Sequence, residues 1–250
     1  MKNTTVLITG ATSGIGKATA EYFAARDARL IVCGRRQERL DALQKQLDTP
    51  THLLNFDVRD RTAVFSAVAS LPSEWKKIDV LINNAGNAHG LAPVHTADID
   101  DWEAMIDGNV KGLMYVTKAV LPQMVERKAG HIINVGSIAG LEVYPNGNVY
   151  CASKFAVDAF TQGLRIDLNP HSIRIGAIHP GLVETEFSMV RFKGDKSRSD
   201  AVYAHLRALQ AEDVAHAIGY MVEAPPHVTI ADLTILPTDQ ANATTINRSK

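Results

Sequence analysis

The chain has 250 residues, of which 46% are hydrophobic and 21% are charged. This length and composition suit one large α/β domain or two small ones with a full hydrophobic core. The net charge of −1 gives no reason to expect a nucleic acid or an anionic membrane as a partner. The sequence has two cysteines, Cys33 and Cys151, and no Cys/His spacing predicts a metal site or a disulfide framework.

The apolar runs in the chain are short. Val6–Ile8 is too short for the core of a signal peptide, and no run approaches the roughly 20 residues that span a bilayer. We therefore expect a soluble cytoplasmic protein with reduced cysteines. Cys33 ends an apolar run, which favours a small buried hydrophobic residue.

Short β-branched runs alternate with longer amphipathic segments along the chain. In chain order, the predicted elements are strand Thr5–Thr9, helix Lys17–Arg26, strand Arg29–Cys33, helix Gln37–Leu47, strand His52–Phe56, helix Arg61–Leu71, strand Val80–Asn83, a helical stretch Asp98–Arg127 with a break by Gly108, Gly112 or Pro122, strand His131–Val135, helix Val149–Leu168, strand Ser172–Ile178 and strand Asp232–Leu236.

These elements define a fold class. Runs without polar alternation, such as Val80–Asn83, suit strands that are buried on both faces. Repeated strand–helix units imply right-handed crossovers. We therefore predict an α/β protein, a Rossmann-type doubly wound parallel sheet of about seven strands with helices on both faces, in a single domain over residues 1–250.

Two segments fall outside this repeat. Residues 180–200 are the longest irregular stretch, with a mobile core at Lys193–Arg198, and a loop of this length in a compact fold is typical of a lid or substrate-binding segment. The polar tail, residues 238–250, is expected to be disordered or docked on a neighbouring subunit.

A glycine-rich loop follows the first strand, with the pattern G-x-x-x-G-x-G over Gly10–Gly16. Glycines between a strand and a helix permit a tight turn and let a pyrophosphate approach the backbone amides at the helix N-terminus. A purely structural turn is the alternative. The cofactor-binding residues predicted in this loop are Gly10, Thr12, Ser13, Gly14, Ile15 and Gly16.

The second strand ends in Gly34-Arg35-Arg36. Sites that select NAD usually place an acidic residue here for the ribose 2′-hydroxyl. Two guanidinium groups instead can bind a 2′-phosphate, so we predict NADP as the cofactor, with Arg35 as the main contact and Ser13 and Arg36 as additional ones. A basic helix start on the surface is the alternative.

Two further strand ends carry polar residues. Asp57 and Val58 follow the third strand, where the Asp57 carboxylate can accept a hydrogen bond from the adenine amino group, although Asp-Val is also an ordinary approach to a helix. Asn83, Ala85 and Gly86 end the fourth strand and are predicted to face the cofactor, with a simple turn as the alternative.

Tyr150 and Lys154 are four residues apart, which places them on one face of a helix. A phenol has a pKa of roughly 10 and is a poor base at neutral pH, and a nearby ammonium favours the phenolate. We therefore expect Lys154 to lower the pKa of Tyr150, so that Tyr150 exchanges a proton with an alcohol or carbonyl oxygen that Ser137 holds. Two solvated helix residues are the alternative.

Together these motifs resemble the short-chain dehydrogenase/reductase family over essentially the whole chain. The matching segments are TGATSGIG at Thr9–Gly16, NNAG at Asn83–Gly86, Asn109 in DGNVKG, Ser137 in INVGSIAG, YCASK at Tyr150–Lys154, and HPG at His179–Gly181 followed by Thr185. The resemblance implies that Ser137, Tyr150 and Lys154 are catalytic and that Asn109 holds a water for proton relay. It also implies that Tyr150 and Lys154 contact the cofactor, that Pro180, Gly181, Val183 and Thr185 line its nicotinamide end, and that the protein is a homo-oligomer, commonly a tetramer.

A narrower resemblance is to the NADP-dependent 3-hydroxy acid dehydrogenases, a group that includes serine and allo-threonine dehydrogenases and has sulfoacetaldehyde reductases as relatives. It is carried by the segments Cys33–Leu40, Leu71–Trp75, Ala119–Arg127, Gly130–Ser137, Gly147–Lys154 and Thr185–Asp195. It implies a small substrate with an anionic group near the reacting carbon.

The chain offers several residues for such a substrate. Arg191 is the candidate partner of the anion, with Lys193 and Arg198 as competing candidates. Tyr144, Asn146 and Asn148 lie between Ser137 and Tyr150 and either face the substrate or pack structurally. Glu184 is a weaker candidate for favouring an amino-bearing substrate.

Three functions are therefore weighed. The first is an NADP-dependent dehydrogenase of small 3-hydroxy acids, such as L-serine, L-allo-threonine or 3-hydroxypropionate. The second is a reductase of another carbonyl, such as sulfoacetaldehyde, a 3-oxoacyl thioester or a bulky ketone. The third is a catalytically silent NADP-binding protein on the same fold, which the retained Ser137, Tyr150 and Lys154 disfavour.

Overall fold

Seven parallel strands form one sheet in the order β3-β2-β1-β4-β5-β6-β7. The structure, a computed structural model, describes residues 1–248. The strands are β1 (Thr5–Thr9), β2 (Arg29–Gly34), β3 (Thr51–Asn55), β4 (Val80–Asn83), β5 (Gly130–Val135), β6 (Ile173–Pro180) and β7 (Asp232–Ile235). All seven predicted strands are thereby confirmed, as is the doubly wound fold class.

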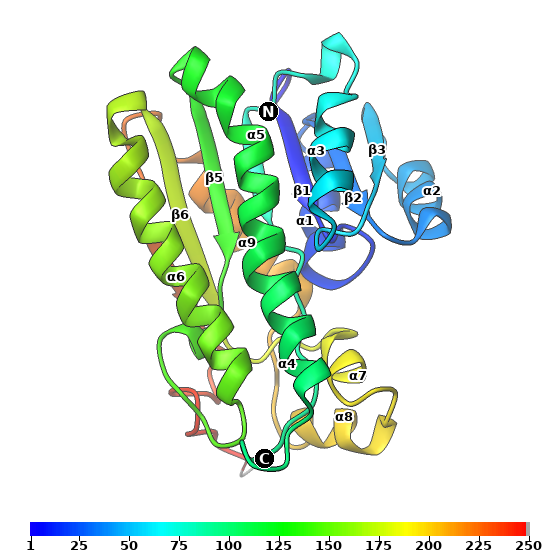
Figure 1. Cartoon of the computed structure of the whole chain (residues 1–250), viewed down its shortest axis with the longest axis vertical. Coiled ribbons are helices and arrows are strands. Elements are labelled where there is room, and N and C mark those ends of the chain that lie inside the picture. The colour runs from blue at the N-terminus through cyan, green and yellow to red at the C-terminus, as the bar shows by residue number, and fades with distance from the viewer. Residues whose placement is uncertain (249–250) are drawn as a thin grey trace.

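Helices cover both faces of the sheet (Figure 1). They are α1 (Gly14–Ala24), α2 (Gln37–Gln46), α3 (Arg61–Ala69), α4 (Ile99–Ile106), α5 (Leu113–Arg127), α6 (Asn148–Leu168), α7 (Phe187–Arg191), α8 (Lys196–Tyr203) and α9 (Ala211–Glu223). Short 3₁₀ segments lie at Ser73–Trp75 (η1), Ile138–Gly140 (η3) and Asn169–His171 (η4), and a π-helical segment lies at Asp107–Gly112 (η2).

The strands are buried on both faces because successive side chains of a strand point to opposite sides. Val6 and Ile8 of β1 pack into one core with α1, α2 and α9, whereas Leu7 packs into a second core with α3, α5 and α6. All three side chains are fully buried. This explains why the strands read as continuous apolar runs without polar alternation.

The strand order reverses between β1 and β4, which is the topological switch point of the sheet. In open α/β sheets, ligands bind outside the carboxyl ends of the strands at this point. The helices α4, α7 and α8 gather at that end of the molecule, which is the lower end in Figure 1. The fold therefore places any site between the strand ends and the α7–α8 segment.

The structure corrects two expectations about helices. The helix α9 was not predicted, although a capping box at Gln210 and Asp213 begins it and Val214, Ile218 and Met221 are fully buried at helical spacing. The expectation of an irregular 180–200 segment is wrong where α7 and α8 form; the Asp195 side chain accepts a hydrogen bond from the Arg198 amide and so begins α8.

The predicted break in the Asp98–Arg127 stretch is confirmed and falls at η2, from Asp107 to Gly112. Pro122 lies inside α5 without ending it. The six-residue π-helical turn inserts into the helical path and marks a common position for functional residues.

The described part of the C-terminal tail lies against its own chain. The Gln240 side-chain carbonyl accepts a hydrogen bond from the Leu182 amide at 2.9 Å, and the Arg248 guanidinium donates to the Val202 carbonyl at 2.9 Å. The tail therefore closes over the 180–200 segment rather than standing free, while its expected contact with a neighbouring subunit stays a prediction. Residues 249–250 of the predicted tail lie outside the described residues. Among the described helices, each is too short or too polar to cross a lipid bilayer.

Candidate active site

A cleft of about 600 Å³ opens at the carboxyl ends of the strands. Its walls come from the loop after β1, the ends of β2 to β6, the first turns of α6, the α7 segment and the C-terminal tail. The cleft is lined by most of the predicted cofactor residues: Gly10, Thr12, Ser13, Gly14, Ile15, Arg35, Arg36, Asp57, Val58, Ala85, Gly86, Tyr150, Lys154, Pro180, Gly181, Val183 and Thr185. Gly16 and Asn83 are the two predicted cofactor residues that do not line it.

The glycine loop turns directly into α1, whose first residue is Gly14. Gly14 has a φ of +49°, a backbone conformation that side chains disfavour. A Cβ at Gly16 would lie 2.3 Å from the Gly10 carbonyl oxygen and 2.5 Å from Asn84 Nδ2. Gly16 therefore allows α1 to pack closely on the loop, and its contribution to the cleft is indirect.

Two arginines after β2 face the cleft from different positions. The Arg36 guanidinium donates to Thr12 Oγ1 at 3.1 Å and to Ser13 Oγ at 3.4 Å, so it stands over the glycine loop. Arg35 is more open, with 60% of its side chain exposed and a 3.5 Å contact to Asp57. The structure thus places Arg36, which the sequence ranked second, closer to the loop than Arg35.

Asp57 is held by its neighbours at the end of β3. Arg59 donates to both carboxylate oxygens, with a shortest distance of 2.7 Å. Burial opposes ionisation of Asp57, but these hydrogen bonds and the positive charges of Arg59 and Arg35 outweigh it and lower the carboxyl pKa. Asp57 is therefore an ionised acceptor on the cleft wall, and Arg59 is a residue that the sequence prediction missed.

The Asn83 side chain lies in a buried hydrogen-bond network and does not line the cleft. Its side-chain amide donates to Thr117 Oγ1 at 2.8 Å and to Asn134 Oδ1 at 2.9 Å, and Asn134 in turn donates to Thr161. This buried network links β4, β5, α5 and α6. Asn84, the next residue, lines the cleft, so the motif reaches the cleft through Asn84, and the cofactor role of Asn83 stays a prediction.

Tyr150 and Ser137 meet at the base of the cleft. Tyr150 lies in the first turn of α6 and is 8% exposed. Burial raises the pKa of Tyr150, the neighbouring Tyr144 adds to this increase, and a hydrogen bond with Ser137 together with the charge of Arg191 opposes it. The Ser137 side chain also accepts a hydrogen bond from the Ala139 amide at 3.1 Å, which fixes its position at the start of η3.

The expected effect of Lys154 on Tyr150 is not what the structure shows. The Lys154 ammonium lies 6.0 Å from the centre of the Tyr150 ring and donates to the Val135 carbonyl at 2.9 Å. Burial lowers the pKa of Lys154 to about 8. The cation that lowers the Tyr150 pKa is Arg191, and the net direction is upward because burial dominates.

Asn109 lies in η2 and is buried against the same region. Its Nδ2 donates to the Asn87 carbonyl at 2.8 Å and to Ser153 Oγ at 3.0 Å, and its Oδ1 accepts from the Asn87 amide at 2.8 Å. A Cβ at Gly86 would lie 3.0 Å from Asn109 Oδ1 and 3.8 Å from Lys154 Nζ. The π-helical turn thus brings the Asn109 side chain close to Lys154. This position is compatible with the predicted role of Asn109 in a proton relay.

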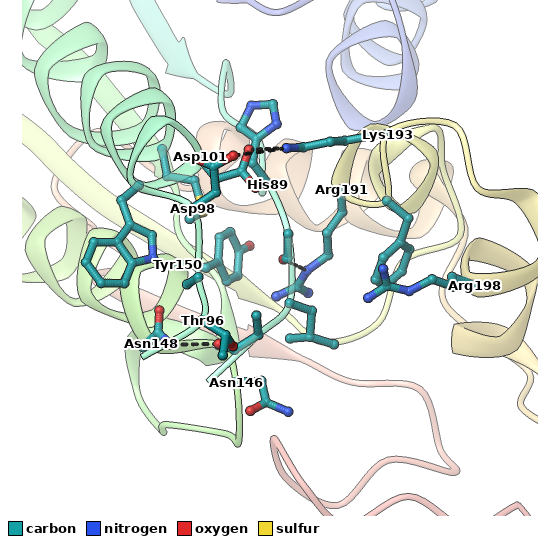
Figure 2. Close-up of a pocket in the computed structure, with 18 residues that line it drawn as sticks. His89, Thr96, Asp98, Asp101, Asn146, Asn148, Tyr150, Arg191, Lys193 and Arg198 are labelled. Carbon is teal, nitrogen blue, oxygen red and sulfur yellow. Dashed lines mark hydrogen bonds and ion pairs between the residues drawn. The ribbon is translucent and has the colours of Figure 1, made fainter. Parts of the chain in front are cut away.

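Arg191 reaches the cleft from the end of α7. Its guanidinium donates to the Tyr144 hydroxyl at 2.6 Å and to the Gly90 carbonyl at 3.2 Å. Its Cζ lies 5.4 Å from the centre of the Tyr150 ring and 5.5 Å from that of Tyr144. Figure 2 shows the Arg191 side chain extending toward Tyr150. Of the three cationic candidates, this is the one beside the phenol.

Lys193 and Arg198 line a second cavity of about 250 Å³ that adjoins Tyr150 and Arg191 (Figure 2). Lys193 pairs with Asp101 at 2.9 Å, and the Arg198 guanidinium lies 4.4 Å from the centre of the Phe192 ring. Both lie outside the lining of the larger cleft. Their charges are therefore directed to the side cavity.

The predicted substrate residues between Ser137 and Tyr150 divide between the two cavities. Tyr144 lines the larger cleft, whereas Asn146 and Asn148 line the side cavity. The Asn148 amide donates to the Ala92 carbonyl at 3.0 Å and its Oδ1 accepts from the Val149 amide at 2.8 Å. Asn148 therefore joins the loop that contains Ala92 to the start of α6.

Glu186 lines the cleft although no sequence motif indicates it. Glu184 is exposed and does not line the cleft. Glu186 precedes α7, lies 3.6 Å from Arg36 and accepts hydrogen bonds from Arg39 at 2.9 Å. It thus connects the α7 segment to the arginines after β2. Only the folded chain reveals this pairing, because 147 residues separate Glu186 from Arg39.

The doubly wound sheet, the glycine loop at its switch point and the Ser-Tyr-Lys group beneath it define the class of dinucleotide-dependent oxidoreductases. The family model described as short chain dehydrogenase matches residues 4–196. The chain belongs to the short-chain dehydrogenase family.

Two relatives of this chain have described activities. It is 48% identical over 239 residues to the NADP-dependent 3-hydroxy acid dehydrogenase YdfG of Escherichia coli, covering 95% of this chain and 96% of the relative. It is 47% identical over 239 residues to sulfoacetaldehyde reductase 2 of Chromohalobacter salexigens, covering 94% and 95%.

Among solved structures, the closed form of a serine dehydrogenase complexed with NADP⁺ superposes with a TM-score of 0.94 at 48% identity, over 96% of this chain and 97% of that one. The serine dehydrogenase from Escherichia coli superposes with a TM-score of 0.84 at 44% identity, over 95% and 99%. These likenesses extend over nearly the full length of each chain.

Proposed function

We propose that this protein is an NADP-dependent dehydrogenase of small 3-hydroxy acids, interconverting the 3-hydroxyl group and the 3-oxo group. The observation that carries the proposal is the position of Arg191, whose guanidinium lies 5.4 Å from the Tyr150 ring inside the cleft. A carboxylate bound there leaves a hydroxyl a few bonds away within reach of the phenol. The names of the relatives point to the same substrate class.

The cleft residues fit NADP. The turn at Gly14 leaves backbone amides at the start of α1 for a pyrophosphate, and Arg36 and Arg35 supply positive charge for a 2′-phosphate. No acidic residue follows β2 in the position that selects NAD. When bound, NADP supplies the hydride-transfer chemistry at its nicotinamide ring.

The protein groups have separate tasks in this proposal. Ser137 holds the substrate oxygen, and Tyr150 takes the hydroxyl proton in oxidation and returns it in reduction. Lys154, with a pKa of about 8, passes protons near neutral pH, and Asn109 holds the water that connects it to solvent. Arg191 orients the substrate anion and stabilises the phenolate by its charge.

A substrate panel with both cofactors tests the proposal. L-serine, L-allo-threonine and 3-hydroxypropionate are expected to turn over with NADP and far more slowly with NAD. A 3-oxoacyl thioester and a bulky ketone are expected to be poor substrates. Turnover of the thioester without turnover of any of the three acids would contradict the proposal.

Variants of Arg191 sharpen the assignment of the anion site. Charge-assisted hydrogen bonds contribute about 1.5–3 kcal/mol, so Arg191→Ala is expected to lower kcat/KM for 3-hydroxypropionate by roughly 10- to 150-fold. A neutral alcohol of similar size, 1,3-propanediol, is the control and should lose much less. Arg198→Ala, which changes a cation of the side cavity, is the matched variant and should retain activity on the acid.

Sulfoacetaldehyde reduction is the second candidate function, because a relative with 47% identity has that activity and a guanidinium also binds a sulfonate. Direct comparison of kcat/KM for sulfoacetaldehyde and for malonic semialdehyde decides between the two.

A catalytically silent role is tested by Tyr150→Phe, which should bind NADPH normally and lose turnover. We further propose that the enzyme is a cytoplasmic homotetramer, which light scattering and fractionation can test.

A further inference from the structure

Behind the active site, three potential metal ligands from different elements converge. They are Asp158 of α6, His179 of β6 and Asp232 of β7. His179 Nε2 lies 3.8 Å from Asp158 Oδ1 and 3.6 Å from Asp232 Oδ1, and the three ligand atoms lie within 4.8 Å of one another. The residues are far apart in sequence, so no spacing motif predicts the cluster.

The histidine carries the argument. Its side chain is 1% exposed, and its buried Nε2 has no hydrogen-bond partner among residues 1–248. Its other ring nitrogen, Nδ1, lies 3.4 Å from the Ser137 carbonyl oxygen. A carbonyl oxygen can only accept, so Nδ1 donates in this contact. In the neutral imidazole, Nε2 then presents its lone pair toward the two carboxylates. An unshared pair buried against two anions calls for a cation between them.

The distances favour a metal ion as that cation. A contact of 3.6 or 3.8 Å is too long for a hydrogen bond, whereas two ligands on a tetrahedral zinc ion are roughly 3.4 Å apart, because zinc binds nitrogen and oxygen at about 2.0–2.2 Å. A histidine that ligates metal usually donates its other ring nitrogen to a carbonyl or carboxylate, which is the arrangement at Ser137. We propose that Asp158, His179 and Asp232 form a binding site for a divalent cation of the zinc type.

The neighbours of the three residues suit this role. Gln162 donates to Asp158 Oδ2 at 2.7 Å, which orients the carboxylate and leaves Oδ1 for the ion. Asp232 is 46% exposed, so its side of the site is open to solvent, which can supply the fourth ligand. The Arg165 guanidinium donates to both Asp232 oxygens, at 3.3 Å to Oδ1 and at 3.2 Å to Oδ2, so an ion bound at Oδ1 competes with Arg165 for that carboxylate. The mixed nitrogen and oxygen donors favour zinc over magnesium or calcium.

The site lies directly beside the catalytic residues. Asp158 is one helical turn after Lys154 on α6, and His179 precedes Pro180 and contacts the carbonyl of Ser137. An ion here would join α6 to β6 and β7 and so hold Lys154 and Ser137 in place from behind. The ion is a positioning element in this proposal and takes no part in proton or hydride transfer.

Zinc binding to the chelator-treated protein tests the proposal. Isothermal titration with ZnCl₂ at pH 7.5 is expected to show one site per chain, and anomalous diffraction at the zinc edge is expected to place the ion between Asp158, His179 and Asp232. Asp232→Asn alters an exposed carboxylate with little risk to folding and should weaken zinc binding at least about 100-fold. His179→Gln should do the same.

The exposed His227 provides the matched control, since His227→Gln removes a histidine from the surface and should leave zinc binding unchanged. The proposal is overturned if both site variants bind zinc like the wild type, if the anomalous peak lies elsewhere, or if the wild type binds no zinc. Neither result depends on turnover, so the metal site and the proposed dehydrogenase activity stand or fall separately.

Discussion

Replacing Arg36 by glutamine tests how the cleft distinguishes NADP from NAD. The Arg36 guanidinium stands over the glycine loop through its contacts with Thr12 and Ser13. Arg35 is the other candidate, but its side chain is 60% exposed, and its guanidinium forms an ion pair with the Asp57 carboxylate at 3.5 Å. The structure therefore predicts that Arg36 contributes more to recognition of the 2′-phosphate than Arg35.

The size of the effect follows from exposure. A charge-assisted hydrogen bond is worth about 1.5–3 kcal/mol, and the 40% exposure of Arg36 places it toward the low end of that range. Arg36→Gln should thus lower the affinity for NADP by roughly 10- to 30-fold, since about 1.4 kcal/mol corresponds to a factor of ten. An exposed ion pair is worth about 1 kcal/mol or less. Arg35→Gln should therefore lower the affinity for NADP by only a few-fold.

The assay is the ratio of kcat/KM for NADP to that for NAD, with NADP binding measured in parallel by calorimetry. Arg39→Gln is the matched control, because Arg39 pairs with Glu186 and does not line the cleft. Only the ratio for the cleft variants should fall. If Arg36→Gln lowers the NADP and NAD values by the same factor, Arg36 does not recognise the phosphate and the argument from its position is wrong.

Three further predictions concern the framework of the site. Gly16→Ala should lower the free energy of unfolding by about 1–3 kcal/mol in urea, because the added Cβ would lie 2.3 Å from the Gly10 oxygen; an unchanged value would show that the loop can relax. Asn83→Ala should cost about 2 kcal/mol of stability, because it breaks a buried amide network, while KM for NADP changes less than about twofold; a large rise in KM would restore Asn83 to the cofactor site. Lys154 has a folded-state pKa of about 8 against an unfolded value of about 10.4, so between these pH values the unfolded chain binds more protons and stability rises with pH. This rise in the free energy of unfolding, on the order of 3 kcal/mol, should be absent in Lys154→Met. If the free energy of unfolding depends on pH in the same way in both proteins, the assignment to Lys154 is wrong.

The sequence predicts the sheet well because its strands are buried on both faces. A run such as Leu7–Ile8 is apolar whichever core each residue enters, so each strand can be located without knowledge of its neighbours. The helix α9 was missed although its buried residues keep helical spacing. The capping box at Gln210 and the helical spacing of its apolar residues are the signals in the sequence that indicate this helix.

The site was predictable at the level of motifs and less so at the level of atoms. Asn83 and Asn84 are adjacent and chemically identical, and only the direction of β4 decides that one enters the buried network and the other the cleft. For Tyr150, the lysine one turn away suggested a lowered pKa, but burial outweighs a charge directed at the Val135 carbonyl. Burial and side-chain direction are tertiary properties that local spacing does not contain.

The α7 segment shows why the substrate end of the cleft depends on the cofactor end. Glu186 precedes α7 and pairs with Arg36 and Arg39, which follow β2. Arg191 is the last residue of α7 and reaches Tyr144 and the Gly90 carbonyl beside Tyr150. One short helix thus carries, at its two ends, the contact to the arginines that suit NADP and the cation that suits a substrate carboxylate. Because a helix moves as a unit, whatever fixes Glu186 against the arginines also fixes Arg191 against the phenol. Under the proposed function, the Arg191 charge is therefore in place for a substrate anion when the α7 segment lies against the arginines after β2.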